Sequence, residues 1–492
     1  MSSPTAAPDT VSPSRSGENL ERGLGNRHLQ MIAIGGAIGT GLFMGSGKTI
    51  NLAGPSILFI YAIIGFFLYF VMRAMGEILL SNLNYKSFRD IVEDIIGPWA
   101  GFFVGWTYWL CWIVIGMADI AAVTSYVLWW FPDLPQFVPA LALVLLLLGL
   151  NLVAVRLFGE IEFWLALIKI IAIVALVVTA VVLVAIGFVS PPVDAALLPE
   201  AAAAYPDGAK ASLANILNAN GGGMFPNGLT GFLGGFQIAF YAFVGIELVG
   251  TAAAETKDPE KSLPKAINAI PIRVVLFYVF ALAAILAVTP YLAIDPAVSP
   301  FVNMFALTGF ALAATVVNFV VLTSAASSMN SGIYSTSRML FGLASTREAP
   351  RAFGRLSDSK VPANALLFSC VCVLPGVALL YASGSIMSAF TYATTLASVL
   401  FIFVWALIIV AYLLYRKRQP ESHAASKYKM PLGPVMCWIV LAFLAAMVVI
   451  LALEKETLTA LLVSPAWFVI LIVAWLIRRQ RQQDDQAGAT TA

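Results

Sequence analysis

The sequence predicts an all-α integral membrane protein with about twelve transmembrane helices, two of which are interrupted near the middle. Three observations lead to this fold class. The chain has 492 residues, of which 60% are apolar and 11% are charged, and its mean hydropathy is +0.89. The apolar residues gather in segments of the length that crosses a bilayer, about 17–25 residues. Two of these segments contain glycine-rich interruptions, which are tolerated at membrane depth only where the backbone is buried in protein or lines a wet cavity.

Twelve segments are apolar and long enough to be membrane spans. The longest have about thirty residues and must tilt or extend past the bilayer. In chain order the segments cover roughly 29–50, 56–80, 99–131, 137–155, 161–189, 229–255, 271–291, 303–333, 361–382, 386–415, 432–453 and 464–478.

The basic residues predict which side of the membrane each loop occupies, because lysine and arginine near spans favour the cytoplasm. With the N-terminus inside, the outer loops hold Lys48, Lys210 and Lys455, Lys169 lies within a span, and the other 24 of the 28 basic residues are cytoplasmic. Residues 1–28 and 479–492 are polar, and the first stretch lacks the features of a signal peptide. We therefore expect a multi-pass protein of the cytoplasmic (inner) membrane, with a disordered N-terminal tail and both termini in the cytoplasm.

The first interruption is the run Gly35-Gly36-Ala37-Ile38-Gly39-Thr40-Gly41. We expect the first predicted helix to break here and to restart near Thr40. The restarted half-helix would direct free N–H groups and a partial positive charge into the cavity, which is the chemistry of an anion receptor. The alternative is that these glycines only allow neighbouring helices to pack closely.

The second interruption is Phe240-Tyr241-Ala242-Phe243-Val244-Gly245-Ile246-Glu247. Carbonyl groups that end the half-helix before Tyr241 would carry a partial negative charge and could hold an ammonium group. A carboxylate receptor that faces an ammonium receptor describes a site for an α-amino acid. Interrupted helices at corresponding places in two halves of a chain indicate a secondary transporter.

Three ionisable residues lie well inside predicted spans, and a charge at such a depth costs roughly 2.5–3.5 kcal/mol even on insertion scales. Lys169 is our candidate proton carrier; the alternative is a static cation paired with Asp119 or Glu247. Glu247 is placed to act as a gate or to close the broken helix by a hydrogen bond, unless it is a protonated carboxyl that joins helices. Asp119 could contact substrate, balance Lys169 or bond a neighbouring helix. Tyr241 adjoins the break and is expected to line the pocket.

Other chemistries find little support in the sequence. The four cysteines fall in predicted spans and the two histidines, His28 and His423, lie outside them, so neither a metal site nor a catalytic nucleophile–base set is expected. The stretch from Gly45 to Thr49 resembles the end of a phosphate-binding loop, but position 42 is leucine where that motif needs glycine. The net charge of +2 is spread over the loops. We expect no enzyme activity, no cofactor and no binding of nucleic acid.

Several stretches together resemble a known family. They are Asn26 to Phe43, Ala242 to Glu247 and Glu255 to Glu260, within a resemblance that runs from about Leu20 to Arg478. The chain resembles the amino acid permeases of the amino acid–polyamine–organocation (APC) superfamily. The motifs Met44 to Thr49, Met72 to Glu77 and Leu248 to Thr251 make it most similar to the bacterial subgroup that transports D-serine, D-alanine and glycine.

This resemblance implies two inverted repeats of five helices, over 29–189 and 229–415, followed by two extra helices over 432–478. It implies proton symport by alternating access, with Lys169 standing where sodium-coupled relatives hold an ion. Two residues depart from the common pattern: Tyr241 stands where relatives often carry Phe or Trp, and Asp119 where many carry Glu. The residues implied to bind substrate are Ala37, Ile38, Gly39, Thr40 and Gly41 for the carboxylate, and Tyr241, Ala242, Val244 and Gly245 for the ammonium.

The expected substrates are small neutral amino acids: glycine, D-alanine, D-serine and L-alanine. The other expected partners are protons and the lipid bilayer, with no obligatory protein partner evident. An exchanger, or a permease for another class of amino acid, is the alternative within transport. A sensor that binds an amino acid without moving it is the alternative from another class.

Overall fold

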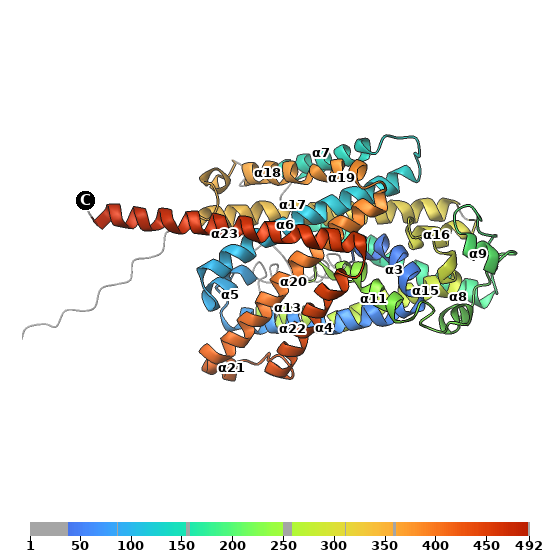
Figure 1. Cartoon of the computed structure of the whole chain (residues 1–492), viewed down its shortest axis with the longest axis horizontal. Coiled ribbons are helices and arrows are strands. Elements are labelled where there is room, and N and C mark those ends of the chain that lie inside the picture. Colours follow the sequence, from blue (N-terminus) through green and yellow to red (C-terminus); the bar gives the residue numbers. More distant parts are fainter. Residues whose placement is uncertain are drawn as a thin grey trace, which may run out of the picture.

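The computed structural model describes residues 38–85, 87–153, 158–248, 258–309, 311–357 and 361–490. Within these ranges the chain is mainly helical, and the helices form an elongated bundle (Figure 1). Each of the twelve predicted apolar segments contains helix in this part of the chain. The prediction of an all-α protein is confirmed.

Up to Ala185 the described part of the chain supplies helices α2 to α8 of the bundle. The first predicted span appears as α2 (Thr40–Phe43) and α3 (Gly45–Ala53), and its part before Ile38 lies outside the described residues. The others are α4 (Ile57–Ser81), the short amphipathic α5 (Phe88–Ile95), α6 (Pro98–Leu128), α7 (Phe137–Val153) and α8 (Phe158–Ala185).

The second half begins with α11 (Gly228–Ala239), which is followed by the one-turn 3₁₀ segment η4 (Tyr241–Phe243). The next span is built from α13 (Pro259–Asn268), α14 (Ile270–Arg273), a π-helical stretch η5 (Val274–Val279) and α15 (Phe280–Val288). Then follow α16 (Pro300–Leu307), α17 (Ala311–Ser345), α18 (Ala363–Val373), α19 (Pro375–Ala382), α20 (Ile386–Arg418), α22 (Gly433–Leu451) and α23 (Lys455–Thr490).

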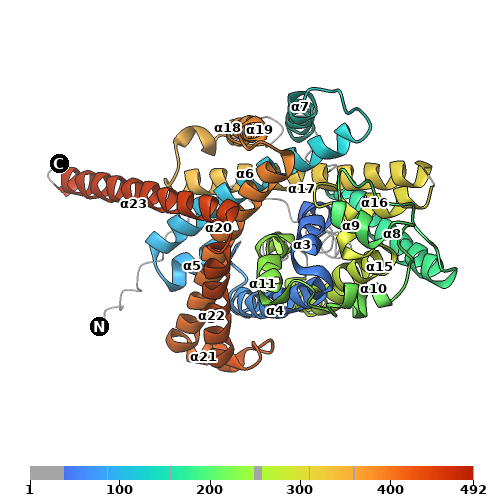
Figure 2. The same ribbon diagram turned by 45° about the vertical axis from the view of Figure 1, so that its right-hand side comes forward.

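Two long helices organise the centre of the bundle. Helix α6 packs along both α17 and α20, while α11 packs against α3. Figure 2 shows α3 and α11 side by side, with α4 next to them. Helix α23 runs over this core, and its C-terminal end extends beyond the rest of the bundle (Figures 1 and 2). The two interrupted segments are therefore neighbours inside the protein.

Hydropathy located the spans better than it located their ends. Nine stretches of the described chain are both long and apolar enough to cross a membrane, one of them the 37-residue Gly45–Ser81, which contains parts of two predicted spans. Phe137–Leu152 and Gly228–Phe243 are apolar but shorter. The predicted span 303–333 is wrong at its start, because Gly309 takes a φ of +76° after α16 and separates it from α17. Glycine ends a helix in this way without interrupting the run of apolar residues.

Candidate functional site

The first interruption is present where the glycines predicted it. Gly39 is extended, with φ −123° and ψ −164°, and helix resumes at Thr40. The amide groups of Leu42 and Phe43 bond back to the Gly39 carbonyl at 3.2 and 3.3 Å. Because the first N–H groups of a helix have no partner within it, Thr40 and Gly41 occupy the positions from which such groups can reach a ligand. Ala37, the first of the predicted carboxylate-binding residues, lies outside the described residues.

The second interruption is also present. Helix α11 ends at Ala239, η4 makes one tight turn, and Val244 is extended with φ −64° and ψ 139°. Gly245 then takes a φ of +97°, a conformation that side chains other than glycine rarely adopt. The requirement for glycine at position 245 is therefore a backbone requirement.

The two interruptions touch each other. A Cβ atom built on Gly41 would lie 2.5 Å from Cα of Ala242, 2.8 Å from its nitrogen and 2.9 Å from Cδ1 of Tyr241. No side chain fits at that separation. The predicted carboxylate-binding backbone and the predicted ammonium-binding backbone therefore lie in contact, with glycine at the point of closest approach.

Polar side chains from three segments meet beside this contact. Thr40 Oγ1 donates a hydrogen bond to Asp119 Oδ1 on α6 at 2.9 Å and lies 3.4 Å from Tyr241 Oη. These side chains are almost completely buried, with exposures of 2%, 0% and 4%. Asp119 Oδ2 has no hydrogen-bond partner among the described residues. Asp119 Oδ2 can therefore accept a further hydrogen bond in this site.

Aromatic rings and a tyrosine hydroxyl hold the second interruption in place. Tyr241 contacts Phe390 of α20 edge to face, with ring centroids 5.9 Å apart. Tyr278 in η5 donates to the carbonyl of Ala242 at 2.9 Å. Phe243 instead packs against Tyr61 and Tyr278. Tyr241 is therefore the aromatic residue of this turn that faces the polar cluster.

Glu247 closes the second interruption by hydrogen bonding to the backbone just after the turn. Its Oε2 accepts a hydrogen bond from the Gly245 amide at 3.1 Å, and its Oε1 accepts one from Tyr108 Oη of α6 at 3.3 Å. The side chain is fully buried. A backbone N–H that the break leaves without a helical partner is thereby satisfied, and the same carboxyl also bonds the neighbouring helix α6.

Lys169 lies on α8 with an exposure of 1%. Its Nζ donates to Ser327 Oγ of α17 at 3.4 Å. Ser324, one turn earlier on α17, donates to the carbonyl of Ile38 at 3.3 Å, so the same helix contacts both the lysine and the first interruption. Asp119 is close enough to interact electrostatically with the lysine. Lys169 is thus connected to the broken-helix region through α17 and Asp119.

Sequence reasoning missed Glu162. This residue is 2% exposed, and its Oε1 accepts a 2.6 Å hydrogen bond from Ser327. It lies at the start of the predicted span 161–189 and was not singled out there. The available signal was its spacing from Lys169, since residues seven apart share one face of an α-helix.

The sequence is similar to those of known proteins. The model of the amino acid permease family matches residues 28–487. The chain belongs to the amino acid permease family. It is 60% identical over 459 residues to the D-serine/D-alanine/glycine transporter of Escherichia coli K12. The aligned region covers 93% of this chain and 94% of that protein. The expected family and the expected similarity to that subgroup are confirmed.

Two further relatives show how broad the likeness is. The permease is 50% identical to the amino-acid permease AapA of Bacillus subtilis, covering 94% of this chain and 96% of AapA. It is 36% identical to the aromatic amino acid transport protein AroP of Escherichia coli O6:H1, covering 94% and 97%. These relatives are transport proteins, and this permease is a multi-span membrane transporter of amino acids rather than an enzyme.

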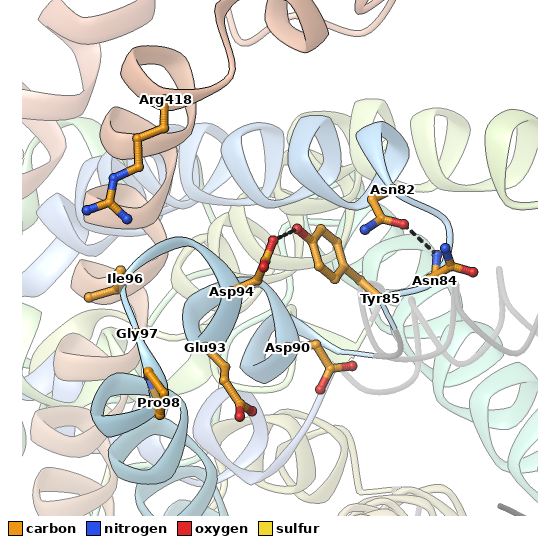
Figure 3. Close-up of a pocket in the computed structure, with 10 residues that line it drawn as sticks. All are labelled: Asn82, Asn84, Tyr85, Asp90, Glu93, Asp94, Ile96, Gly97, Pro98 and Arg418. Carbon is orange, nitrogen blue, oxygen red and sulfur yellow. Dashed lines mark hydrogen bonds between the residues drawn. The ribbon is translucent and has the colours of Figure 1, made fainter. Parts of the chain in front are cut away.

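A separate cavity of about 580 Å³ lies at the connections between α4, α5 and α6 (Figure 3). Tyr85 Oη donates a hydrogen bond to Asp94 Oδ2 there at 2.5 Å. Burial of the Tyr85 hydroxyl is the main cause, and the nearby Asp94 carboxylate the second, that raises the pKa of Tyr85 to about 12. In the described parts of the chain no three His, Cys, Asp or Glu residues are grouped to hold a metal ion. The cavity shares no residue with the two interruptions, and its lining consists of Asn82, Asn84, Tyr85, Asp90, Glu93, Asp94, Ile96, Gly97, Pro98 and Arg418.

Proposed function

We propose that this permease is a proton-coupled importer of small neutral amino acids, in particular glycine, D-alanine, D-serine and L-alanine, and that it works by alternating access. The observation that carries the proposal is the contact between Gly41 and Ala242, which brings two interrupted helices together in the buried interior. The likeness to the D-serine/D-alanine/glycine transporter, at 60% identity, supports the choice of substrates.

In this proposal the substrate carboxylate binds at the start of α2, at the amides of Thr40 and Gly41 beside Ile38 and Gly39. The ammonium group binds carbonyls of the second interruption, around Tyr241, Ala242, Val244 and Gly245. The Ala242 carbonyl already accepts from Tyr278, but a carbonyl oxygen has two lone pairs and can accept a second donor.

The side chains around the site favour a small substrate. Tyr241 packs against Phe390, and Thr40 is held by Asp119, so side chains from four helical segments lie around the contact between the interruptions. A methyl or hydroxymethyl side chain requires little further space. Asp119 and Tyr241 are therefore the residues that we expect to tune selectivity.

We assign the coupled proton to Lys169, because its ammonium group is buried beside the first interruption and interacts with Asp119. Movement of one proton with a zwitterionic substrate carries one net charge. A membrane potential of 100 mV supplies about 2.3 kcal/mol per charge, which would support roughly fifty-fold accumulation. Glu247 holds the second interruption and is proposed to act in gating.

The proposed topology has two inverted repeats of five helices, over 29–189 and 229–415, then two additional helices over 432–478. The distribution of lysine and arginine supports placing both termini in the cytoplasm. The bacterial relatives support the inner membrane as the location.

Uptake of radiolabelled glycine and D-alanine into proteoliposomes tests the proposal, with and without an inward proton gradient and in the absence of sodium. We expect accumulation above equilibrium only when the gradient is present. Exchange of internal for external substrate without net accumulation would instead indicate an exchanger. Binding without any movement would indicate a sensor, and lack of glycine and D-alanine binding would exclude these substrates.

A further inference from the structure

Glu162 and Lys169 stand on one face of α8 and meet at a single hydroxyl group. Their separation of seven residues is almost two turns of helix. A long side chain on a helix leans toward the N-terminus, and the lysine therefore reaches back toward the glutamate. Lys169 Nζ donates to Ser327 Oγ at 3.4 Å, and Ser327 Oγ donates to Glu162 Oε1 at 2.6 Å.

The hydrogen bonds of this Lys169–Ser327–Glu162 chain all point in one direction. The ammonium group donates to the hydroxyl oxygen, and the hydroxyl proton points at the carboxylate. Groups that exchange protons must lie within hydrogen-bond reach, directly or through one intermediate group. The 2.6 Å bond from Ser327 to Glu162 meets this condition, and the 3.4 Å contact from Lys169 to Ser327 meets it once the two atoms move a few tenths of an ångström closer.

All three side chains are out of contact with solvent. Their exposures are 1% for Lys169, 1% for Ser327 and 2% for Glu162. Glu162 Oε2 finds no hydrogen-bond partner in the described ranges. Among the described residues, the other charged group that acts on Lys169 is Asp119 of α6. Burial penalises charge, and transfer of one proton replaces a buried ion pair by two neutral groups.

We propose that Glu162 is the proton acceptor of Lys169 and that Ser327 is the bridge between them. This inference rests on the proposed function, in which Lys169 carries the coupled proton. In the transfer, one N–H bond of the Lys169 ammonium breaks while an O–H bond forms at Ser327. The original Ser327 O–H bond breaks while one forms at Glu162 Oε1, which leaves a neutral amine, an unchanged hydroxyl and a carboxylic acid.

The position of Glu162 gives the transfer a direction across the membrane. It is the first residue of the apolar stretch Glu162–Ala185, whereas Lys169 lies two turns deeper. In the proposed topology this end of α8 is cytoplasmic. A proton taken from the region of the substrate site therefore moves toward the cytoplasmic surface when it passes from Lys169 to Glu162, as import requires.

The test compares two measurements on the full-length permease in proteoliposomes. One is glycine accumulation driven by a proton gradient, and the other is exchange of labelled for unlabelled glycine at equal pH. Glu162→Gln keeps an oxygen that accepts from Ser327 but cannot take up the proton. We expect accumulation to fall at least tenfold while exchange stays within about twofold of the unmodified protein.

Variants of the bridge make the test independent of Glu162 itself. Ser327→Ala removes the hydroxyl and should reproduce the Glu162→Gln result, whereas Ser327→Thr keeps it and should retain accumulation. Ser369→Ala is the matched control. Ser369 of α18 is also a buried hydroxyl, and it accepts a hydrogen bond from Trp109 of α6. It should leave the ratio of accumulation to exchange unchanged.

The outcomes separate this inference from the proposed function. If Lys169→Ala loses accumulation but Glu162→Gln keeps it, the assignment of Glu162 is wrong and the proposed function stands. If the unmodified permease shows no proton-driven accumulation, both fall. Should Glu162→Gln fail to fold, the Ser327 variants decide. Loss of accumulation with exchange intact in Ser327→Ala, together with retained accumulation in Ser327→Thr, supports the acceptor role of Glu162. Equal accumulation in the two Ser327 variants contradicts it.

Discussion

Gly41 lies so close to Ala242 that a Cβ atom at position 41 would stand 2.5 Å from the Ala242 Cα atom. The two residues are 201 positions apart in the chain, yet their backbones are in contact at the centre of the bundle. Neither interrupted segment can change its backbone without affecting the other. The predictions below begin with this contact.

Substitution of Gly41 by Ala or Val should abolish glycine binding. The added carbon meets backbone atoms of Ala242, and backbone cannot turn aside as a flexible side chain can. Binding of labelled glycine to purified protein measures the effect. Gly234→Ala on α11 is the control, since nothing lies within 4 Å of a Cβ at that position. Unchanged affinity in Gly41→Ala would contradict the assignment of this contact to the substrate site.

Thr40→Val should weaken glycine binding, because it preserves the shape of the side chain but removes the hydroxyl that donates to Asp119. A buried acceptor left without its donor costs about 1–3 kcal/mol of stability, and if the site is restored only when substrate binds, the same free energy lowers the affinity by at most about 150-fold. Thr40→Ser keeps the hydroxyl and should stay near the unmodified affinity. Equal affinities for the Val and Ser variants would show that the Thr40–Asp119 bond does not support binding.

Lys169→Ala should abolish proton-driven accumulation of glycine, since it removes the proposed proton carrier while leaving both interruptions intact. Labelled glycine inside proteoliposomes should then reach the external concentration and no more. Measurement of that ratio under an imposed proton gradient checks the prediction. Concentrative uptake that persists in this variant would rule out the coupling role.

Glu348→Gln should destabilise the protein. Glu348 Oε2 accepts from Arg89 of α5 at 2.5 Å, and Oε1 accepts from Arg478 of α23 at 2.9 Å, while the carboxylate side chain is 1% exposed. The substitution removes the negative charge that pairs with the partly buried guanidinium groups of Arg89 and Arg478. Breaking a buried ion pair costs about 3–5 kcal/mol. Thermal unfolding in detergent should show a Tm lowered by several degrees.

The matched control for Glu348 is an exposed ion pair. Lys261 Nζ lies 3.1 Å from Asp258 Oδ2, and these side chains are 79% and 53% exposed. Asp258→Asn should change stability by less than about 1 kcal/mol. A Tm shift as large as that of Glu348→Gln would show that burial does not explain the difference.

The interruptions could be predicted from the sequence, because glycine-rich runs are easy to recognise inside otherwise apolar segments. Gly39 is extended at the first break, Gly41 stands at the closest contact with Ala242, and Gly245 takes a positive φ at the second break. Span ends were predicted less well: the last span was expected over 464–478, whereas α23 covers Lys455–Thr490. Helical hydrogen bonding continues past the point where apolar residues end, and hydropathy does not register that.

Partners across helices were the least predictable feature. Asp119 or Glu247 was considered as a static partner for Lys169; Asp119 interacts with the lysine electrostatically, and Ser327 also joins the lysine to Glu162, which was not considered. That outcome depends on which way a long side chain leans and on which neighbouring helix presents a hydroxyl at the right height. Neither quantity can be obtained from a single sequence.

The π-helical stretch Val274–Val279 has a consequence for insertions and deletions in this protein. A π turn contains more residues than an α turn, so the span accommodates an additional residue at the height of the second interruption. Removal of one residue inside this six-residue stretch would let a regular α-helix form while α15 keeps its orientation, because six π-helical residues turn the chain about as far as five α-helical ones. Removal of one residue from α15 would instead rotate the side chains on one side of the gap by about 100° relative to those on the other. A deletion inside the stretch that leaves Tyr278 bonded to the Ala242 carbonyl should therefore be less harmful than a deletion one turn later, although both would hardly change the hydropathy profile.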